Sequence, residues 1–383
     1  MMPTNLPPLS LYIHLPWCIR KCPYCDFNSH EKKGELPEKA YVDALMDDLD
    51  QQLSRIHDRP LKSIFFGGGT PSLFSAEAIA AILTGVKNRI AFDERIEITL
   101  EANPGAIEQN RFSGFRDAGV NRLSLGIQSF QDEKLKILGR IHHGKEAECA
   151  IEIAKGAGFT NFNVDLMFGL PQQTIEDALF DLTTALSFQP THLSWYQLTI
   201  EPNTFFHHQP PLLPADDAIW DIQLAGQKLL QQHHFKQYEV SAYAKENKYC
   251  KHNINYWEFG DYLGIGAGAY SKMTDQDGNI TRFSQVKHPK AYLDAATRNK
   301  INYQTIAKDD RIFEFMLNAL RLTDGVNAAL FTERTGVALT EIAPCIEKAK
   351  QQGLLVDDTE KLCASQKGAP FLNNLIAMFL PPP

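Results

Sequence analysis

Three cysteines near the start of the chain carry the clearest chemical signal in the sequence. Cys18, Cys22 and Cys25 follow a run with strand character, in the spacing C-x3-C-x2-C. Cysteine thiolates bind iron–sulfur clusters and zinc. A disulfide framework needs cysteines that pair, whereas this chain has seven, of which four are scattered. The group therefore indicates a metal site in a reducing compartment.

The spacing favours an iron–sulfur cluster over zinc. A loop of this length can wrap round a [4Fe-4S] cubane and supply ligands to three of its irons. The remaining iron can then bind a small chelating molecule, and the amino and carboxylate groups of S-adenosylmethionine meet that need. Structural zinc takes four protein ligands, and the fourth here could come only from His14 or His30. A zinc site and three ordinary buried cysteines remain the alternatives.

Short runs with strand character alternate with amphipathic stretches of helical period. The predicted strands are residues 9–14, 62–66, 96–101, 122–127, 161–167 and 192–197. The predicted helices between them are residues 37–54, 75–87, 109–118, 145–157 and 174–186. A helix at 216–233, a strand at 237–241 and a glycine-rich segment at 263–269 follow. The alternation predicts a parallel β/α fold, and periodicity alone leaves an open sheet and a full or partial barrel both possible.

Polar residues and glycines gather where these predicted strands end. In a β/α barrel the carboxyl ends of the strands share one face, so such residues should meet there. Glycines let a ligand approach backbone N–H groups, and a guanidinium can hold a carboxylate with two hydrogen bonds. Taken singly, each residue is explained by a cap, a turn or an ion pair, whereas their joint placement favours a ligand site. The set is Gly67, Gly68, Gly69, Thr70, Glu101, Asn103, Gln128, Arg140 and Asp165.

The segment from Cys18 to Cys25, Cys-Ile-Arg-Lys-Cys-Pro-Tyr-Cys, resembles the signature of the radical S-adenosylmethionine superfamily. Residues 12–18, Tyr-Ile-His-Leu-Pro-Trp-Cys, narrow the resemblance to the branch that contains oxygen-independent coproporphyrinogen III oxidase and its haem-chaperone relatives of the HemW type. The resemblance implies an α/β fold, a partial (β/α)6 TIM-like barrel, with a [4Fe-4S] cluster and bound S-adenosylmethionine. The residues that it assigns to S-adenosylmethionine are Tyr12, Tyr24, Gly68, Gly69, Thr70, Glu101, Gln128, Arg140 and Asp165.

Departures from the oxidase pattern point to the haem chaperones. Oxidases extend the motif with a fourth cysteine, where this chain has Phe27, and carry a longer segment ahead of the motif than the 17 residues found here. The sequence His252-Asn-Ile-Asn-Tyr256-Trp257 also resembles the HNxxYW motif of the haem-chaperone group. Imidazole is a good axial ligand of haem iron, and aromatic rings can cover a porphyrin face, so His252 is the candidate haem ligand. A capped turn with a packed tryptophan explains these residues equally well.

The pattern changes beyond about residue 305. Ile312, Phe315, Met316 and Ala319 lie on one helical face, and further helical stretches, a short strand and an apolar segment follow. This order predicts a small, mainly helical, winged-helix-like domain. This region contains eight Lys and Arg residues and ten Asp and Glu residues, so its net charge is negative. A negative charge does not suit DNA binding, so a structural or interaction role is expected. We expect a barrel core at 1–240, a closing subdomain with the HNxxYW motif at 241–305, and the C-terminal domain at 306–383.

Composition narrows the classes of function. The net charge of −8, without a long basic block, argues against a nucleic-acid partner. The sequence lacks an apolar run of about 18 residues and a signal-peptide pattern, so a cytoplasmic protein that is not integral to a membrane is expected. The leading hypothesis is a haem chaperone that passes haem to an acceptor protein. The alternatives are an oxidase that decarboxylates coproporphyrinogen III and a zinc-stabilised scaffold.

Overall fold

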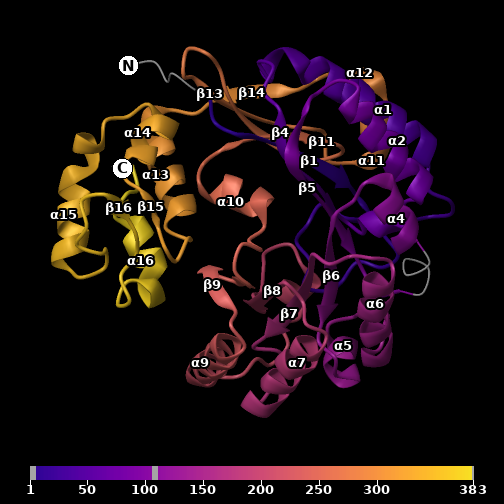
Figure 1. The fold of residues 1–383 in the computed structure, drawn as a ribbon, viewed down its shortest axis with the longest axis horizontal. Coiled ribbons are helices and arrows are strands. Elements are labelled where there is room, and N and C mark those ends of the chain that lie inside the picture. Colours follow the sequence, from indigo (N-terminus) through magenta and orange to yellow (C-terminus); the bar gives the residue numbers. More distant parts are fainter. Residues whose placement is uncertain (1–5, 106–110, 382–383) are drawn as a thin grey trace.

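A single curved sheet organises most of the chain (Figure 1). The computed structural model describes residues 6–105 and 111–381. Twelve strands form the sheet, in the order β14-β13-β12-β11-β1-β4-β5-β6-β7-β8-β10-β9. The six predicted strands are parallel neighbours at its centre: β1 (Leu9–Leu15), β4 (Leu61–Gly68), β5 (Phe92–Ala102), β6 (Arg122–Gln128), β7 (Phe162–Phe168) and β8 (His192–Gln197). The predicted parallel β/α fold is confirmed, as a partial barrel whose two edge strands, β14 and β9, do not pair with each other.

These segments form strands because one face of each is apolar and packs under the helices, while the other face carries polar residues toward the barrel interior. Six of the seven residues of β1 are buried, as expected for a parallel strand with helices on one side and an occupied barrel interior on the other. The helices that connect the strands cover the outer face of the sheet (Figure 1). They are α1 (Glu38–Gln52), α2 (Ala76–Lys87), α4 (Phe112–Ala118), α5 (Asp132–Ile137), α6 (Gly144–Gly156), α7 (Ile175–Ser187) and, after the short α8 (Phe205–His208), α9 (Asp216–Gln232).

The helix ends follow local capping chemistry. The Ser75 side chain accepts a hydrogen bond from the Ala78 N–H at the start of α2, and Thr174 forms a capping box with Asp177 at the start of α7. Gly119 ends α4 with a φ of 111°, which a residue with a side chain rarely adopts. The first residues of the helix predicted at 109–118, Gln109 and Asn110, lie outside the described part of the chain.

The glycine-rich segment at 263–269 belongs to the main sheet. It contains most of β11 (Asp261–Ile265), which pairs in parallel with β1 on the side opposite β4. Antiparallel strands β12 (Tyr270–Thr274), β13 (Ile280–Ser284) and β14 (Asn302–Thr305) extend this edge. At the other edge lie β10 (Ala242–Ala244) and β9 (Lys236–Glu239). Segments far apart in sequence therefore flank the same central strands.

A second hydrophobic core lies in the C-terminal region, which is mainly helical as predicted. Its elements are α13 (Lys308–Ala319), β15 (Val326–Asn327), α14 (Ala329–Thr335), α15 (Ala343–Gln351), β16 (Lys361–Leu362) and α16 (Leu372–Ala377). The short helix α10 (Lys251–Trp257) contacts β1, β4 and β11 as well as α13, and so lies between the sheet and this region (Figure 1). Helices α11 (Pro289–Leu293) and α12 (Ala295–Arg298) connect β13 to β14. No helix in the described residues is long and apolar enough to cross a bilayer.

Candidate functional site

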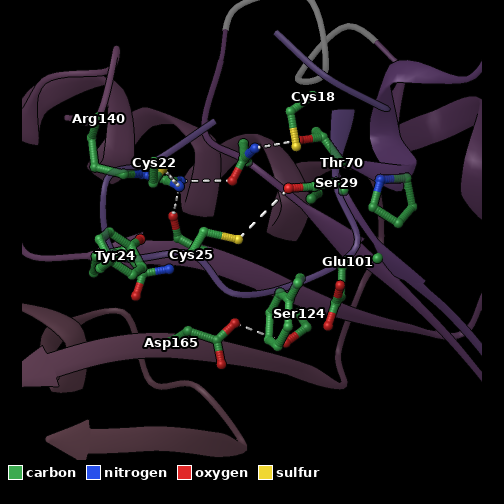
Figure 2. A pocket seen from close by; sticks show the side chains of 18 of the residues that line it. Cys18, Cys22, Tyr24, Cys25, Ser29, Thr70, Glu101, Ser124, Arg140 and Asp165 are labelled. Carbon is green, nitrogen blue, oxygen red and sulfur yellow. Dashed lines mark hydrogen bonds between the residues drawn. The ribbon is translucent and has the colours of Figure 1, made fainter. Parts of the chain in front are cut away.

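The loop after β1 carries the three cysteines into a cavity of about 300 Å3 (Figure 2). Cys18 closes the short strand β2 (Trp17–Cys18), which pairs with β3 (His30–Glu31), and all three cysteines are free thiols that line the cavity. Burial raises the pKa of the Cys18 and Cys25 thiols, so metal binding there must displace protons. Within the described ranges, no three His, Cys, Asp or Glu side chains converge closely enough for one metal ion. Three thiols on the wall of one cavity are a ligand set that can serve three irons of a cubane.

Eight of the nine residues expected to bind S-adenosylmethionine line the same cavity. They are Tyr24, Gly68, Gly69, Thr70, Glu101, Gln128, Arg140 and Asp165. Tyr12 lies instead on the wall of a neighbouring cavity, where its hydroxyl bonds to His14 Nδ1 at 3.0 Å. Four successive strands, β4 to β7, the segments that follow them and the cysteine loop thus bring residues from positions 18 to 165 to one place, as the strand-end argument predicted.

The glycines after β4 are required by close packing as well as by access to the cavity. A Cβ on Gly68 would lie 2.6 Å from the ring of His14, and one on Gly69 would lie 2.5 Å from the carbonyl oxygen of Trp17. Gly68 also has a φ of 118°, in the region that favours glycine. The backbone therefore fits against the cysteine loop on one side and remains open to the cavity on the other.

Arg140 is a partly buried cation beside the cysteines. Its Nη1 lies 3.5 Å from Cys22 Sγ, and its Nη2 donates to Asn103 Oδ1 at 2.6 Å and to the Gly126 carbonyl at 2.7 Å. Its Nε is buried and has no hydrogen-bond partner among the described residues. The guanidinium of Arg140 lines the cavity, so this side of the cavity suits an anionic or electron-rich ligand.

Two partly buried carboxyl groups, those of Glu101 and Asp165, form the opposite wall (Figure 2). Asp165 accepts hydrogen bonds from Ser124 Oγ at 3.0 Å and from Asn163 Nδ2 at 2.8 Å. Burial, and secondly the charge of Asp165, raise the pKa of Glu101 to about 8, and burial also raises the pKa of Asp165. Carboxyl groups with raised pKa values in a cavity are typical of a site that binds ligand hydroxyl or ammonium groups.

The strand ends also supply residues that the sequence reasoning missed. Ser124, Ser194 and Tyr196 line the cavity, and the Tyr196 hydroxyl donates to Gln128 Oε1 at 2.7 Å. Gln128 has a φ of 70° at an irregularity in the β6–β7 pairing, a conformation that aims its side chain inward. The available signal was the position of these polar residues two apart in otherwise apolar strands, which places them on the interior face.

A second, larger cavity of about 860 Å3 adjoins the first. The sheet, α10 and α13 enclose it, and Phe27, Gly68 and Glu101 line both cavities. Its aromatic residues are Tyr12, Phe27, Tyr256, Tyr262, Tyr270 and Phe313. The volume and the aromatic side chains suit a ligand of this size with apolar surface, while the charged residues Glu101, Arg282, Asp310 and Glu314 suit polar groups at its margin.

His252 and Tyr256 line this second cavity, one helical turn apart on α10. His252 Nδ1 bonds to Ser63 Oγ at 3.0 Å, which leaves Nε2 as the nitrogen that can bind a metal. Burial lowers the pKa of His252 to about 3, so the imidazole is neutral. Trp257 instead packs against the second core and lies 4.4 Å from the guanidinium of Arg321. Within the motif, the packing explanation therefore holds for the tryptophan, while the histidine and tyrosine line the cavity.

Comparison with known proteins identifies the family. The model of the radical SAM superfamily matches residues 12–182, and that of the HemN C-terminal domain matches residues 306–371. The protein named heme chaperone HemW from Haemophilus influenzae is 52% identical over 382 residues, covering 98% of this chain and 99% of that protein. The protein of the same name from Escherichia coli is 49% identical, with coverage of 98% and 99%. The chain belongs to the HemW family.

A HemW-family chain shares its fold with an oxidase. The solved structure of Escherichia coli coproporphyrinogen III oxidase, HemN, described as a radical SAM enzyme, matches with a TM-score of 0.81 over 98% of this chain and 90% of that one. Its sequence identity is 23%, so this likeness establishes the fold. The resemblance to the radical S-adenosylmethionine superfamily and to its HemW-type branch is confirmed.

Proposed function

We propose that the protein is a haem chaperone that carries a [4Fe-4S] cluster with bound S-adenosylmethionine and passes haem to an acceptor protein. The observation that carries this proposal is the aromatic cavity of about 860 Å3 with the neutral imidazole of His252 in its wall. The names of the relatives from Haemophilus influenzae and Escherichia coli support it. We also propose a cytoplasmic location, because a cluster held by cysteines needs thiols that stay reduced.

The residues of the smaller cavity fit the cluster and its cofactor. Cys18, Cys22 and Cys25 would hold the cluster, because they are free thiols on one cavity wall. The guanidinium of Arg140 and the carboxyl groups of Glu101 and Asp165 line this cavity and offer complementary partners for the polar groups of S-adenosylmethionine. When bound, the reduced cluster supplies an electron to the sulfonium of the cofactor.

His252 is the proposed haem ligand in the larger cavity. Imidazole ligates haem iron in its neutral form, and the depressed pKa keeps His252 neutral throughout the physiological range. The hydrogen bond with Ser63 fixes the ring orientation, as partners of ligating histidines usually do. Tyr256 and Tyr262, whose ring centroids lie 5.0 Å apart, provide aromatic surface in the same cavity.

The alternative function is decarboxylation of coproporphyrinogen III. We retain it because the oxidase HemN has the same fold. An anaerobic assay of cluster-reconstituted protein with S-adenosylmethionine and a reductant separates the two. We expect stoichiometric haem binding and transfer of haem to apomyoglobin, used as a probe acceptor. Formation of protoporphyrinogen at enzymatic rates would overturn the proposal.

A further inference from the structure

We propose that Arg282 is the receptor for a carboxylate of the bound tetrapyrrole, and that Glu314 occupies its place until the ligand arrives. The inference rests on the proposed function and specifies how the larger cavity recognises its ligand. Haem carries two propionate groups. A cavity that takes up haem either leaves both carboxylates in solvent or binds at least one, and we propose the second.

The charge of the cavity wall singles out Arg282. Among the described residues that line the cavity, Arg282 is the one Lys or Arg, while Glu101, Asp310 and Glu314 are acidic. His252 is neutral because its pKa is lowered to about 3, and burial likewise lowers the pKa of His14. An anionic group placed elsewhere on this wall would meet carboxylates without a compensating cation, which costs free energy.

The sheet register points Arg282 at the ligand side. Tyr262, Lys272 and Arg282 are paired in turn across β11, β12 and β13, which puts them on one face of the sheet. Lys272 is buried and forms a salt bridge with Asp261 at 3.1 Å. Its charge is therefore neutralised by a residue that does not line the cavity. The Arg282 side chain is 37% exposed and can therefore exchange its partner.

The present partner of Arg282 has the chemistry of a propionate. Arg282 Nη1 and Nη2 donate to Glu314 Oε1 and Oε2, both at 2.7 Å, in the two-bond geometry that guanidinium and carboxylate groups favour. A porphyrin carboxylate can make the same two bonds, so the exchange replaces one carboxylate with another. Glu314 lies on α13, next to the cavity-lining Phe313, whereas Arg282 lies on β13. The exchange therefore breaks an ion pair between the C-terminal region and the sheet.

Two porphyrin probes test this assignment. Haem and haem dimethyl ester differ only in whether the propionates are charged, and each is titrated into the full chain by absorbance. We expect Arg282→Gln to weaken haem binding roughly tenfold and to leave the binding of the ester unchanged, because a charge-assisted pair is lost only for haem. Glu314→Gln should strengthen haem binding by removing the competitor, again without an effect on the ester.

Controls separate this inference from the proposed function. Arg89→Gln breaks a similar two-bond pair with Asp50 outside the cavity and should change neither affinity. Equal losses for haem and ester in Arg282→Gln, or unchanged haem affinity in both cavity variants, overturn the role of Arg282 while the chaperone proposal stands. If the wild type binds neither probe, the proposed function fails and this inference fails with it.

Discussion

Phe27 stands between the two cavities, at the position where the family resemblance implies a fourth cysteine in the oxidases. It follows Cys25 by two residues, lines both cavities and leaves 63% of its surface exposed. A large apolar side chain that is exposed in an empty cavity is typical of a contact surface for an apolar ligand. The residue expected to distinguish this chain from the oxidases therefore also lines the proposed haem cavity.

Replacing Phe27 should affect haem more than the cluster. We expect Phe27→Ala to weaken haem binding roughly tenfold, because the aromatic wall loses apolar contact area, while the cluster absorbance after reconstitution stays as in the wild type. Phe205→Ala is the matched control, since Phe205 is exposed on α8 and lines neither cavity. Unchanged haem affinity in Phe27→Ala, or loss of the cluster alone, would contradict the assignment.

Glu101 should make cofactor binding depend on pH. With a pKa raised to about 8, its carboxyl group is neutral in the free site at pH 6 and ionised at pH 9. Ligand hydroxyl and ammonium groups bond the ionised form better, so the affinity of the cluster-loaded protein for S-adenosylmethionine should rise with pH through about 8. Anaerobic calorimetry at several pH values measures this, and Glu101→Gln should remove that part of the slope. A variant that retains the full slope would show that another group titrates.

At the residue scale the sequence indicated the proposed cluster ligands but not their surroundings. Cys18, Cys22 and Cys25 could be found because three thiols in one loop have few other uses. Ser124 and Ser194 carried only the weaker signal of polar residues spaced two apart in apolar strands, and the fold alone shows that their face of the strands borders the cavity. Arg282 and Glu314 meet across 32 positions of the chain, and only the fold brings them together.

At the scale of the elements, one buried carboxyl group links α1 to the edge of the sheet that β11 to β14 form. It belongs to Asp48 and acts through hydrogen bonds. Asp48 Oδ2 accepts from the Gly266 N–H at 3.1 Å and from the Tyr292 hydroxyl at 2.7 Å, and Gln285 bonds to its Oδ1. Burial raises the pKa of Asp48 to about 7. Gln285 Oε1 has no partner among the described residues, and it could accept from protonated Asp48 if the amide were reversed.

Asp48 should make the protein less stable as pH rises. The folded state holds the proton up to about pH 7, whereas the unfolded chain loses it near the ordinary value of 3.8. Stability therefore falls between about pH 4 and pH 7, by on the order of 4 kcal/mol over the full range. We expect the melting temperature of the wild type to fall from pH 5 to pH 8 by more than that of Asp48→Asn.

Asp50→Asn on the same helix is the control for this measurement. The Arg89 guanidinium lowers the pKa of Asp50, so this carboxylate stays ionised over the tested range and contributes no slope. An equal fall in melting temperature from pH 5 to pH 8 in the wild type and in Asp48→Asn would contradict the role of Asp48.

The central elements were largely predictable, whereas the added edge strands β11, β12, β13 and β14 were missed. The six central strands are long, apolar and separated by amphipathic helices, so local pattern was sufficient to find them. β11 was missed because it is five residues long and contains Gly264, and its strand conformation depends on pairing with β1, more than 240 residues earlier. The glycine has a packing reason, since a Cβ there would lie 2.1 Å from the Tyr270 carbonyl oxygen.

On the scale of the whole molecule, two cores and an intervening helix define the architecture. The first core includes Leu263, Phe283 and Tyr292 together with the central strands, and the second includes Phe315 and Phe331. We propose a boundary near residue 306, in agreement with the match of the C-terminal family model from that position. The boundary expected at residue 240 stays a proposal, because β11–β14 continue the main sheet.

The two cavities should bind their ligands separately. Replacing Cys18, Cys22 and Cys25 together by alanine removes the ligands of the cluster but leaves His252, α10 and α13 in place. We expect this triple variant to lose the binding of S-adenosylmethionine and the cluster absorbance, while its haem affinity stays within about threefold of the wild type. Loss of haem binding in a variant that melts like the wild type would show that one site holds both ligands.

The most direct test of the account is a haem titration that compares His252→Ala with the wild type and with His208→Ala, whose exposed histidine lies on α8. We expect the wild type and His208→Ala each to bind one haem per chain and to have the same Soret spectrum. In His252→Ala the Soret band should shift and the affinity should fall at least roughly tenfold, because the iron loses its imidazole ligand. Unaltered spectrum and affinity in His252→Ala would contradict the account.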